Sequence, residues 1–297
     1  MIVWALFDSG NGCYKQAVEK YFNGELEVYS IGIDIENKNH HFLHLNLADY
    51  SELFGKSELY QALDKLPTPD ILLASPPCES WSIASSIKRG NVCWYTEELN
   101  TLFGVVEATN HFTLRTKEQL EQHFEKTPYF KKHWWKTVYN RINGELCAFN
   151  IIRIIERYKP HVWVIENPQS SRLWRYYRQI QNFHGIANVA HYNAYDKSFL
   201  KKPTTFYSNI PLNLKTTPEP PEVTMHSRVA KATGRPMINS YNERSNILLP
   251  LIRDILMKCI RTITPFDYKS DNLKRLAISP TEDNPFEVHD STVTERS

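Results

Sequence analysis

The feature that most constrains the fold is a series of short apolar runs that alternate with helical patterns. Ile2–Phe7 is such a run, and a helical pattern over Cys13–Phe22 follows it after a glycine-bearing turn. Short apolar runs bounded by turn residues are typical of strands buried on both faces of a sheet. Their alternation with helices predicts an α/β fold with a mostly parallel, doubly wound sheet.

The sheet-forming pattern is interrupted once. It covers residues 1–92 and 144–263, separated by an insertion at 93–143, and a polar tail without periodicity follows at 264–297. Further strands are expected at Val28–Ile35, Phe42–Leu47, Ile71–Ala74, Val162–Ile165, Val189–Tyr192 and from Lys202 onward. Further helices are expected at Ser57–Leu66, Leu146–Tyr158, Ser171–Phe183 and Ser245–Ile263. The helix at Leu146–Tyr158 is expected to bury a stripe of Phe149, Ile152 and Ile155.

The insertion mixes aromatic with basic side chains, and two interpretations of it stay open. Aromatic and basic groups together suit base stacking and phosphate contact, with Lys131, Lys132 and Lys136 as the basic candidates. Alternatively, the aromatic rings pack on the core and the lysines are merely solvated. The first interpretation predicts that these lysines contribute to nucleic-acid binding.

The overall composition excludes several classes of protein. The five cysteines are scattered without a Cys-x-x-Cys pair, which argues against a disulfide framework and a zinc site and favours a reducing cytoplasm. His40, His41 and His44 match no standard zinc spacing, so no metal is expected. No apolar run approaches the ~20 residues of a membrane span. The formal charge of +2 neither demands nor excludes a nucleic-acid partner.

Polar loops follow four of the predicted strands. They are Asp8–Gly12, Asp34–Glu36, Ser75–Ser82 and Glu166–Pro168. In an open α/β sheet, ligands bind at the carboxyl ends of the strands. A glycine turn lets backbone approach a cofactor, and an acidic residue at the end of the second strand can accept hydrogen bonds from a ribose. Although a lone Cys78 is more often an inert thiol, these loops together outline a reaction site.

The residues of these loops resemble the motifs of the cytosine-C5 DNA methyltransferases. Pro77-Cys78-Glu79-Ser80-Trp81-Ser82 is similar to their Pro-Cys-Gln-x-Phe-Ser signature, and Glu166-Asn167-Pro168 to their Glu-Asn-Val. Phe7-Asp8-Ser9-Gly10-Asn11-Gly12 resembles their first motif, Phe-x-Gly-x-Gly. The resemblance covers roughly residues 1–90 and 145–260, and Ser-Pro-Pro-Cys with Lys-Pro-Thr looks most like the small, phage-type branch.

This resemblance implies a Rossmann-like, S-adenosylmethionine-dependent methyltransferase acting on DNA. Cys78 would attack C6 of a flipped-out cytosine, which makes C5 nucleophilic, and Glu166 would bind N3 and the exocyclic amine. The residues implied for the cofactor are Phe7, Asp8, Gly10, Gly12, Asp34, Ile35, Asn46, Asp49 and Pro76. Those implied for the substrate are Ser82, Asn167, Arg172 and Arg175. A restriction enzyme is a conceivable partner.

The chain also departs from the family pattern at several points. Glu79 replaces the glutamine after the cysteine, and Asn46-Leu47 replaces the adenine-reading Asp-Ile, although Asp49 follows closely. No Gln-x-Arg-x-Arg follows Glu166, which leaves Arg172 and Arg175 as candidates for the arginine at the target base. The stretch from 209 to 245 is too short for the usual target-recognition domain.

Two alternatives to a DNA methyltransferase follow from these departures. The substrate could be RNA, since the family has a tRNA-modifying branch with a similarly reduced recognition region. The chain could also be a non-catalytic nucleic-acid-binding relative. The Ser-Pro-Pro tripeptide resembles amino-methyltransferases as well, but Cys78 and Glu166-Asn167 argue against that class.

Overall fold

The computed structural model describes residues 1–8, 12–34, 37–82, 93–96, 100–101, 104–105, 112–125, 134–224, 227–237 and 246–264. The chain divides into two compact units, Met1–Ile263 and Thr264–Ser297. Every helix and strand described below belongs to the first unit.

The first unit is built on a seven-stranded sheet with the order β10-β11-β9-β4-β1-β2-β3. The strands are β1 (Ile2–Leu6), β2 (Glu27–Gly32), β3 (Phe42–His44), β4 (Ile71–Ala74), β9 (Val162–Pro168), β10 (Ile186–Ala190) and β11 (Thr204–Ser208). The first five pair in parallel, whereas β11 runs antiparallel to both β9 and β10. The predicted α/β fold with a mostly parallel sheet is thus confirmed, and it is compatible with a Rossmann-like fold.

The strand order reverses in the middle of the sheet. From β1 the chain moves outward through β2 and β3, and then returns to place β4 and β9 on the other side of β1. At such a switch point, the loops after the two central strands turn to opposite faces and leave a crevice between them. The loops after β1 and β4, which contain Asp8 and Cys78, therefore flank the crevice.

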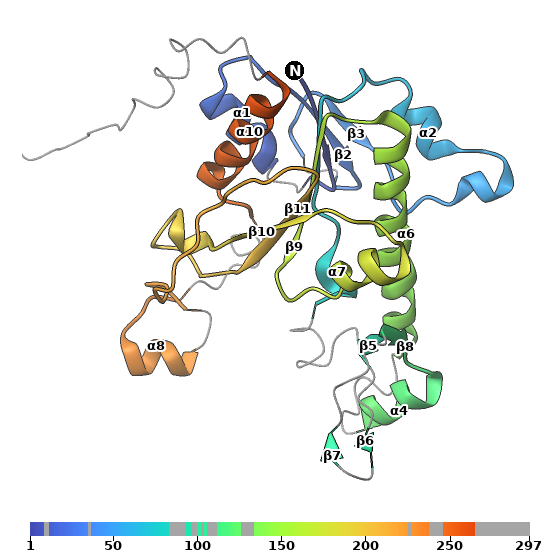
Figure 1. Ribbon diagram of the computed structural model, residues 1–297, viewed down its shortest axis with the longest axis vertical. Coiled ribbons are helices and arrows are strands. Elements are labelled where there is room, and N and C mark those ends of the chain that lie inside the picture. The colour runs from blue at the N-terminus through green and yellow to red at the C-terminus, as the bar shows by residue number, and fades with distance from the viewer. Residues whose placement is uncertain are drawn as a thin grey trace, which may run out of the picture. The chain divides into compact units, whose positions relative to one another are not determined.

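Helices cover both faces of the sheet. The longer ones are α1 (Cys13–Tyr21), α2 (Glu58–Leu63), α4 (Lys117–Glu125), α6 (Trp134–Tyr158), α8 (Ser227–Thr233) and α10 (Leu249–Ile263). Figure 1 shows α1 and α10 side by side on one face and α6 on the other. All four residues of β4 are buried, as its unbroken apolar run predicts.

The insertion shares a helix with the sheet domain. Two small antiparallel pairs lie in it, β5 (Trp94–Thr96) with β8 (Phe112–Leu114) and β6 (Asn100–Thr101) with β7 (Gly104–Val105). Helix α6 then starts at Trp134 and runs for 25 residues. The expected boundary between 143 and 144 therefore lies inside a continuous helix.

Several aromatic side chains of the insertion pack on the core. Trp94 stacks on Phe112 with ring centroids 4.9 Å apart and meets the edge of Tyr176 at 5.5 Å. By contrast, Trp135 and Tyr139 at the start of α6 are 45% and 67% exposed. The core-packing interpretation therefore holds for Trp94 and Phe112. Lys131 and Lys132 lie outside the described residues.

Helix α6 buries a different stripe from the expected one. Ile152 and Ile155 are buried, but Phe149 is 43% exposed. The helix instead turns Ile151 and Ile154, both fully buried, toward the core. The prediction for Phe149 was wrong because periodicity places residues on a helix face only to within the width of the apolar stripe.

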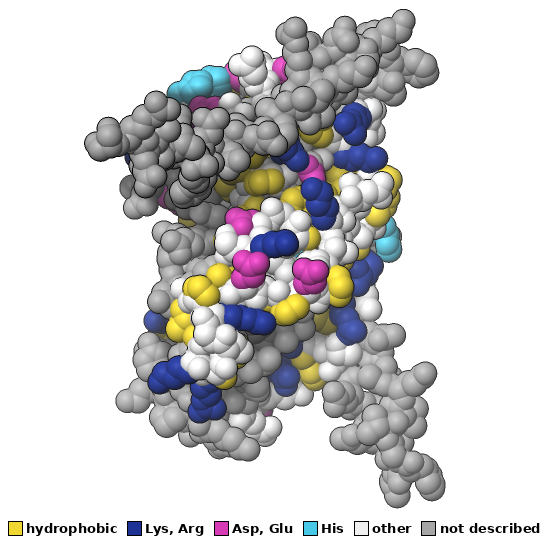
Figure 2. Space-filling model, turned by 90° about the vertical axis from the view of Figure 1, so that its left-hand side faces the viewer, with side chains coloured by type: hydrophobic (Ala, Val, Ile, Leu, Met, Phe, Trp, Pro, Cys, Tyr) yellow, Lys and Arg dark blue, Asp and Glu magenta, His cyan; other side chains and the backbone are white. Residues whose placement is uncertain are grey.

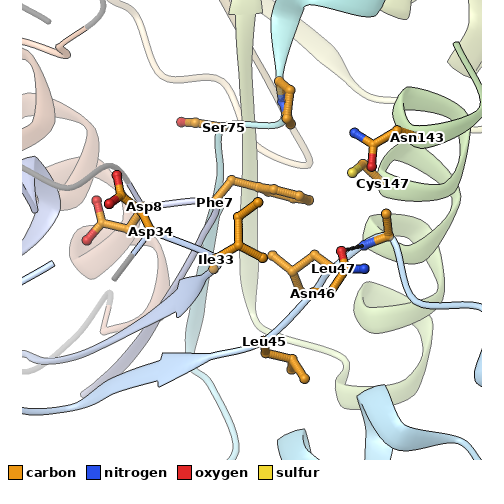
Figure 3. A pocket seen from close by; sticks show the side chains of 13 residues that line it. Phe7, Asp8, Ile33, Asp34, Leu45, Asn46, Leu47, Ser75, Asn143 and Cys147 are labelled. Carbon is orange, nitrogen blue, oxygen red and sulfur yellow. Dashed lines mark hydrogen bonds between the residues drawn. The ribbon is translucent and has the colours of Figure 1, made fainter. Parts of the chain in front are cut away.

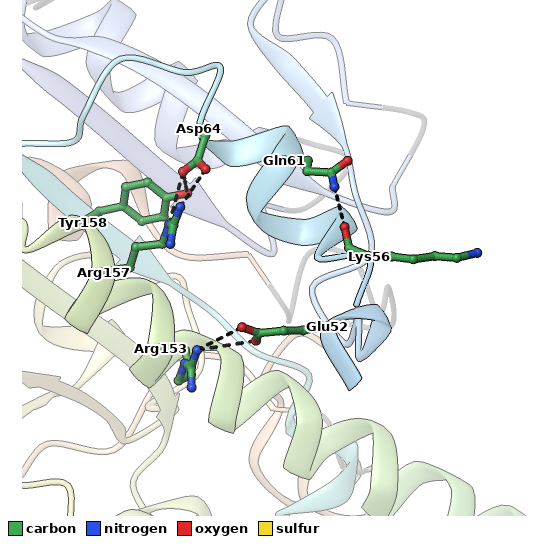
Figure 4. A network of polar contacts seen from close by, with 7 residues as sticks. All are labelled: Glu52, Lys56, Gln61, Asp64, Arg153, Arg157 and Tyr158. Atoms are coloured by element: carbon green, nitrogen blue, oxygen red, sulfur yellow. Dashed lines mark hydrogen bonds and ion pairs between the residues drawn. The ribbon is translucent and has the colours of Figure 1, made fainter. Parts of the chain in front are cut away.

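Polar contacts fix α6 to the segment that follows β3. Arg157 donates two hydrogen bonds to Asp64, at 3.2 and 2.7 Å, and the Tyr158 hydroxyl donates to the same carboxylate at 2.6 Å (Figure 4). The amide of buried Asn150 donates to the carbonyl oxygens of Leu47 and Asp49, each at 2.8 Å. These bonds determine how close α6 lies to the loop after β3.

Among the described residues that Figure 2 shows, lysines and arginines are interspersed with acidic and apolar side chains. None of the described helices has the length and apolar character needed to cross a bilayer. Within the described ranges, no group of three or more His, Cys, Asp or Glu side chains could hold a metal ion.

Candidate active site

A pocket opens at the switch point of the sheet, where the loops after β1, β2, β3 and β4 meet helix α6 (Figure 3). It is lined by Phe7, Asp8, Gly32, Ile33, Asp34, Leu45, Asn46, Leu47, Ala48, Ser75, Pro77, Asn143 and Cys147. The expected cofactor residues Phe7, Asp8, Asp34 and Asn46 are thus brought together. Gly10 and Ile35 lie outside the described residues.

Phe7 is held in an unusual backbone conformation. Its φ of 59° lies in the left-handed region, and its N–H donates to the Ile31 carbonyl at 2.8 Å. Such a conformation costs a bulky residue ~1–3 kcal/mol and persists only where the surroundings enforce it. It directs the ring into the pocket beside Ile33, which is 68% exposed (Figure 3). These two apolar groups form a surface suited to a flat heterocycle.

Asp8 belongs to the framework of the pocket wall. The Ser30 hydroxyl donates to its carboxylate at 2.6 Å and the Asn37 amide at 3.3 Å. A Cβ on Gly12 would lie 3.5 Å from Asn37 Oδ1, and the φ of Gly12 is 57°, so glycine is required there for its backbone conformation. Half-buried Asp34 also lines the pocket and provides a second carboxylate.

Three other expected cofactor residues have different surroundings. The Asn46 side chain lines the pocket, but its Oδ1 accepts from the Ala48 N–H at 3.0 Å (Figure 3). Asp49 lies in a second depression, where its carboxylate accepts from Ser51 N–H and Oγ. Pro76 is buried, and the neighbouring Pro77 lines the pocket instead.

Helix α6 provides a wall that the sequence analysis missed. Asn143 and Cys147, four residues apart, face the pocket from this helix. The spacing of one helical turn was visible in the sequence, but the insertion boundary had separated the two residues. Burial raises the pKa of the Cys147 thiol to about 12, which leaves it unreactive.

Cys78 is the least buried of the cysteines and sits directly after β4 in the short helix η2 (Cys78–Ser80). The N–H groups of Trp81 and Ser82 donate to its carbonyl at 3.0 and 2.9 Å. Ser80 Oγ donates to the Asn140 carbonyl of α6 at 2.5 Å. Helix α6 therefore also fixes the cysteine loop.

The contact between α6 and η2 depends on a glycine. A Cβ at Gly144 would lie 2.4 Å from the Ser80 Cβ and Oγ and 3.2 Å from Trp81 Nε1. Real Cβ atoms do not approach other atoms so closely. Gly144 is thus needed for close approach between the helix and the cysteine loop.

Glu166 and Lys202 lie beside Cys78. Burial, and then the charge of Glu166, raise the pKa of the Cys78 thiol, while Lys202 lowers it. Burial raises the pKa of Glu166, against the effects of Lys202 and of a hydrogen bond from Ser75. Burial lowers the pKa of Lys202, against the charges of Glu166 and Cys78. A thiol, a carboxyl and an ammonium group are therefore mutually coupled in a desolvated site.

Lys202 is the principal functional candidate that the sequence analysis overlooked. It precedes β11, whose Thr204 pairs with Pro168 at the end of β9. Its Nζ lies 4.5 Å from the centroid of the Tyr192 ring and 3.5 Å from the Asn246 carbonyl. The Lys-Pro-Thr sequence by itself gives no position for this lysine in the site. The pairing of β11 with β9 places it beside Glu166.

Glu79 has a minor influence on the cysteine. Its side chain is exposed, and its effect on the Cys78 pKa ranks behind those of burial, Glu166 and Lys202. The immediate surroundings of the thiol are therefore dominated by groups other than Glu79.

The remaining candidates have structural contacts. Buried Asn167 donates its amide to the Pro76 carbonyl at 3.0 Å, which joins the end of β9 to the cysteine loop. Ser82 bonds back to Cys78. Arg172 donates its N–H to the Trp81 carbonyl at 3.0 Å, and the Arg175 guanidinium donates to Thr96 Oγ1. Lys202, rather than either arginine, is the cation that perturbs both Cys78 and Glu166.

Comparison with models of known protein families gave no match, and a search of curated proteins found no similar sequence.

Proposed function

We propose that this chain is a Rossmann-like methyltransferase that transfers a methyl group from S-adenosylmethionine to C5 of cytosine in DNA. The observation that carries the proposal is the placement of Cys78, Glu166 and Lys202 next to a pocket at the switch point of the sheet. The five free thiols agree with a reducing compartment such as the cytoplasm.

The residues of the pocket fit the proposed cofactor. Phe7 and Ile33 offer apolar faces for an adenine ring, and Asp34 offers a carboxylate for ribose hydroxyls. S-adenosylmethionine supplies an electrophilic methyl group when it is bound. The loop from Ser75 to Pro77 belongs both to this pocket and to the cysteine segment, which would bring the methyl group close to the target base.

The three coupled side chains account for activation of the base. The thiolate of Cys78 forms a bond to C6 of cytosine, and electron density moves to C5 and N3. Glu166, whose raised pKa favours a bound proton, donates a hydrogen bond or proton at N3 and so neutralises the developing charge. The ammonium of Lys202 stabilises the thiolate before attack.

The cycle closes without any redox partner. With the cofactor bound, C5 would take the methyl group as the bond between that methyl group and the cofactor sulfur breaks, and S-adenosylhomocysteine would be the leaving group. The C5 hydrogen then leaves as a proton to a base, and the electron pair of that C–H bond restores the C5–C6 double bond as the Cys78 thiolate departs. Cys78 and Glu166 then return to their starting states. Because Cys78 lies in a partly buried loop, the target cytosine must leave a duplex to reach it.

The test uses duplex DNA that contains 5-fluorocytosine. Fluorine at C5 cannot leave as a proton does, so the covalent complex with Cys78 accumulates in the presence of S-adenosylmethionine. We expect an adduct for the wild type and for Cys259→Ala, a buried cysteine in α10, and none for Cys78→Ser.

Other outcomes would redirect the proposal. An adduct with RNA but not with DNA would support the RNA methyltransferase alternative. Absence of an adduct on either nucleic acid, together with no binding of S-adenosylmethionine by calorimetry, would overturn methyl transfer. Nucleic-acid binding would then favour the non-catalytic relative.

A further inference from the structure

Tyr14 and Ser75 form a pair of hydroxyl groups that the proposed chemistry does not use. Tyr14 lies in α1, its side chain is buried, and its hydroxyl oxygen is 2.7 Å from Ser75 Oγ. Ser75 follows the last residue of β4 and lines the pocket. Among the residues that the structure describes, Ser75 is the one hydrogen-bond partner of the Tyr14 hydroxyl. A helix that covers the sheet is therefore connected to the loop that leads to Cys78.

The strand register places Ser75 next to Glu166. Strands β4 and β9 pair in parallel with Ala74 opposite Ile165, so the next residues along, Ser75 and Glu166, are opposite each other. The two segments remain adjacent beyond this point, because the asparagine after Glu166 donates its amide to the Pro76 carbonyl at 3.0 Å. Opposite residues of a parallel pair direct their side chains to the same face of the sheet. The hydrogen bond from Ser75 to Glu166 agrees with this register.

The number of available protons determines the direction of these hydrogen bonds. Burial raises the pKa of Tyr14 well above its ordinary value, so the phenol keeps its proton. The proton of a buried hydroxyl requires an acceptor, and for Tyr14 that acceptor is the Ser75 oxygen. A serine hydroxyl has a single proton to donate. Ser75 therefore accepts from Tyr14 and donates to Glu166.

A hydrogen-bonded chain with this direction determines where the Glu166 proton resides. In a neutral carboxyl, the oxygen that accepts from Ser75 is the carbonyl oxygen, so the acid proton is on the other oxygen. The other titratable groups around Glu166 are Cys78 of η2, Lys202 before β11 and Tyr192 of η4 (Tyr192–Ala194). Lys202 acts on the carboxyl through its charge, whereas Ser75 acts through a directed bond.

We infer that Tyr14 and Ser75 are positioning residues that hold the Glu166 proton on the oxygen from which it reaches N3 of the target cytosine. Neither residue needs to touch the base, because both act through the carboxyl of Glu166. This inference rests on the proposed function, in which N3 is the acceptor. The hydrogen-bonded chain can be tested without that function, because it acts on a group whose titration is measurable in the protein alone.

The first measurement follows the carboxyl of Glu166 directly. Protein labelled with ¹³C at the glutamate side-chain carboxyls is titrated by NMR, and Glu166→Gln assigns the resonance. We expect Ser75→Ala to raise the pKa of Glu166, because it deletes a hydrogen bond that lowers this pKa. Tyr14→Phe should raise it by less, since Ser75 keeps its own proton but loses the donor that polarises it.

The second measurement is the rate of adduct formation with the 5-fluorocytosine duplex at saturating S-adenosylmethionine. We expect Ser75→Ala to slow it roughly tenfold, because the Glu166 proton is then held more tightly and on either oxygen. Tyr14→Phe should slow it by less. Ser75→Thr keeps the hydroxyl and should retain the wild-type rate and Glu166 pKa.

Tyr29→Phe is the matched control. It also removes a tyrosine hydroxyl that is bonded to a carboxylate, since Tyr29 donates to Glu27 at 2.8 Å at the start of β2. It should leave the Glu166 pKa and the adduct rate unchanged. Circular dichroism establishes that each variant is folded.

The inference and the proposed function fail in different ways. If wild type forms the adduct, an unchanged Glu166 pKa in folded Ser75→Ala and Tyr14→Phe would overturn the inference alone. Normal adduct rates in both variants, despite a raised Glu166 pKa, would also overturn it. If wild type forms no adduct but both variants raise the Glu166 pKa, the methyl-transfer proposal fails and the hydrogen-bonded chain through Ser75 stands.

Discussion

At the scale of single residues, the reactivity of Cys78 depends on a balance between burial and one cation. Burial and Glu166 favour the neutral thiol, and Lys202 favours the thiolate. Burial raises the pKa of Cys147 and of Cys259 to about 12, and that of Cys93 to about 11 although nearby arginines lower it. Partial exposure and the ammonium of Lys202 therefore distinguish Cys78, the proposed nucleophile, from the other cysteines.

Removal of the Lys202 ammonium group should lower the reactivity of the Cys78 thiol. We expect Lys202→Met to raise the pKa of Cys78, because it deletes the positive charge that lowers it, and to reduce kcat roughly 100-fold. The pH dependence of Cys78 alkylation by iodoacetamide, followed by mass spectrometry, should move to higher pH. Lys201→Met, the adjacent half-buried lysine, is the control, and an unshifted alkylation profile in Lys202→Met would contradict the role.

The raised pKa of Glu166 predicts a trade-off between stability and activity. Because its pKa in the folded protein is above the ordinary 4.5, its contribution to stability is fully present below pH 4.5 and is lost as the pH rises through the raised pKa. Because glutamine does not titrate, Glu166→Gln does not lose stability in this way as the pH rises. We therefore expect the variant to gain stability relative to wild type as the pH rises from 4 to 8, while its kcat falls roughly 100-fold or more.

Chemical denaturation at several pH values checks this prediction. Glu156→Gln, which removes an exposed carboxylate from α6, should show no gain in stability that increases with pH. A stability difference between Glu166→Gln and wild type that is independent of pH would show that Glu166 titrates normally.

At the scale of elements, helix α6 organises the site because it contacts both halves of it. Asn143 and Cys147 line the pocket, and Gly144 lies against Ser80 in the cysteine loop. Bonds from Arg157 and Tyr158 to Asp64 anchor the far end of the helix (Figure 4). A shift of this helix would therefore change the pocket proposed for the cofactor and the position of Cys78 together.

A methyl group at Gly144 tests this role. In most helix interiors Gly→Ala stabilises by ~1 kcal/mol, but here the new Cβ would lie 2.4 Å from Ser80 atoms. We expect Gly144→Ala to destabilise the fold by ~1–3 kcal/mol and to slow adduct formation at Cys78. The double variant Gly144→Ala with Ser80→Gly removes the obstructing atoms and should recover the rate in part. Equal stability and rate in Gly144→Ala and wild type would contradict the close packing.

At the scale of the whole molecule, the chain divides after Ile263, at the end of α10. This helix packs against α1 and buries Leu251, Ile252, Ile255, Leu256, Cys259 and Ile260. Because the sequence after Ile263 is polar and without periodicity, we expect a chain that ends at Ile263 to melt within ~2 °C of the full chain. A chain that ends at Asn246 should fail to fold cooperatively, since it lacks the buried apolar side chains of α10, worth ~1.5–3 kcal/mol each. Calorimetry of the two truncations checks both expectations.

The local sequence determined the fold class and several positions of the site. Apolar runs ended by Pro76 or by Asp8 predicted the parallel strands, because strands buried on both faces must be apolar throughout. Since the carboxyl ends of parallel strands share one edge, this was sufficient to expect Phe7, Asp34, Cys78 and Glu166 in one crevice.

Only the tertiary structure decided which further groups enter that crevice. Lys202 reaches Glu166 because β11 inserts antiparallel beside β9, and Cys147 reaches the pocket because α6 continues through the expected insertion boundary. Arg172 and Arg175, the candidates for the arginine at the target base, are bonded to the carbonyl of Trp81 and to Thr96 of β5. The physical reason is common to all of them. Periodicity reports which residues prefer burial along one element, whereas strand order and helix length determine which distant elements meet.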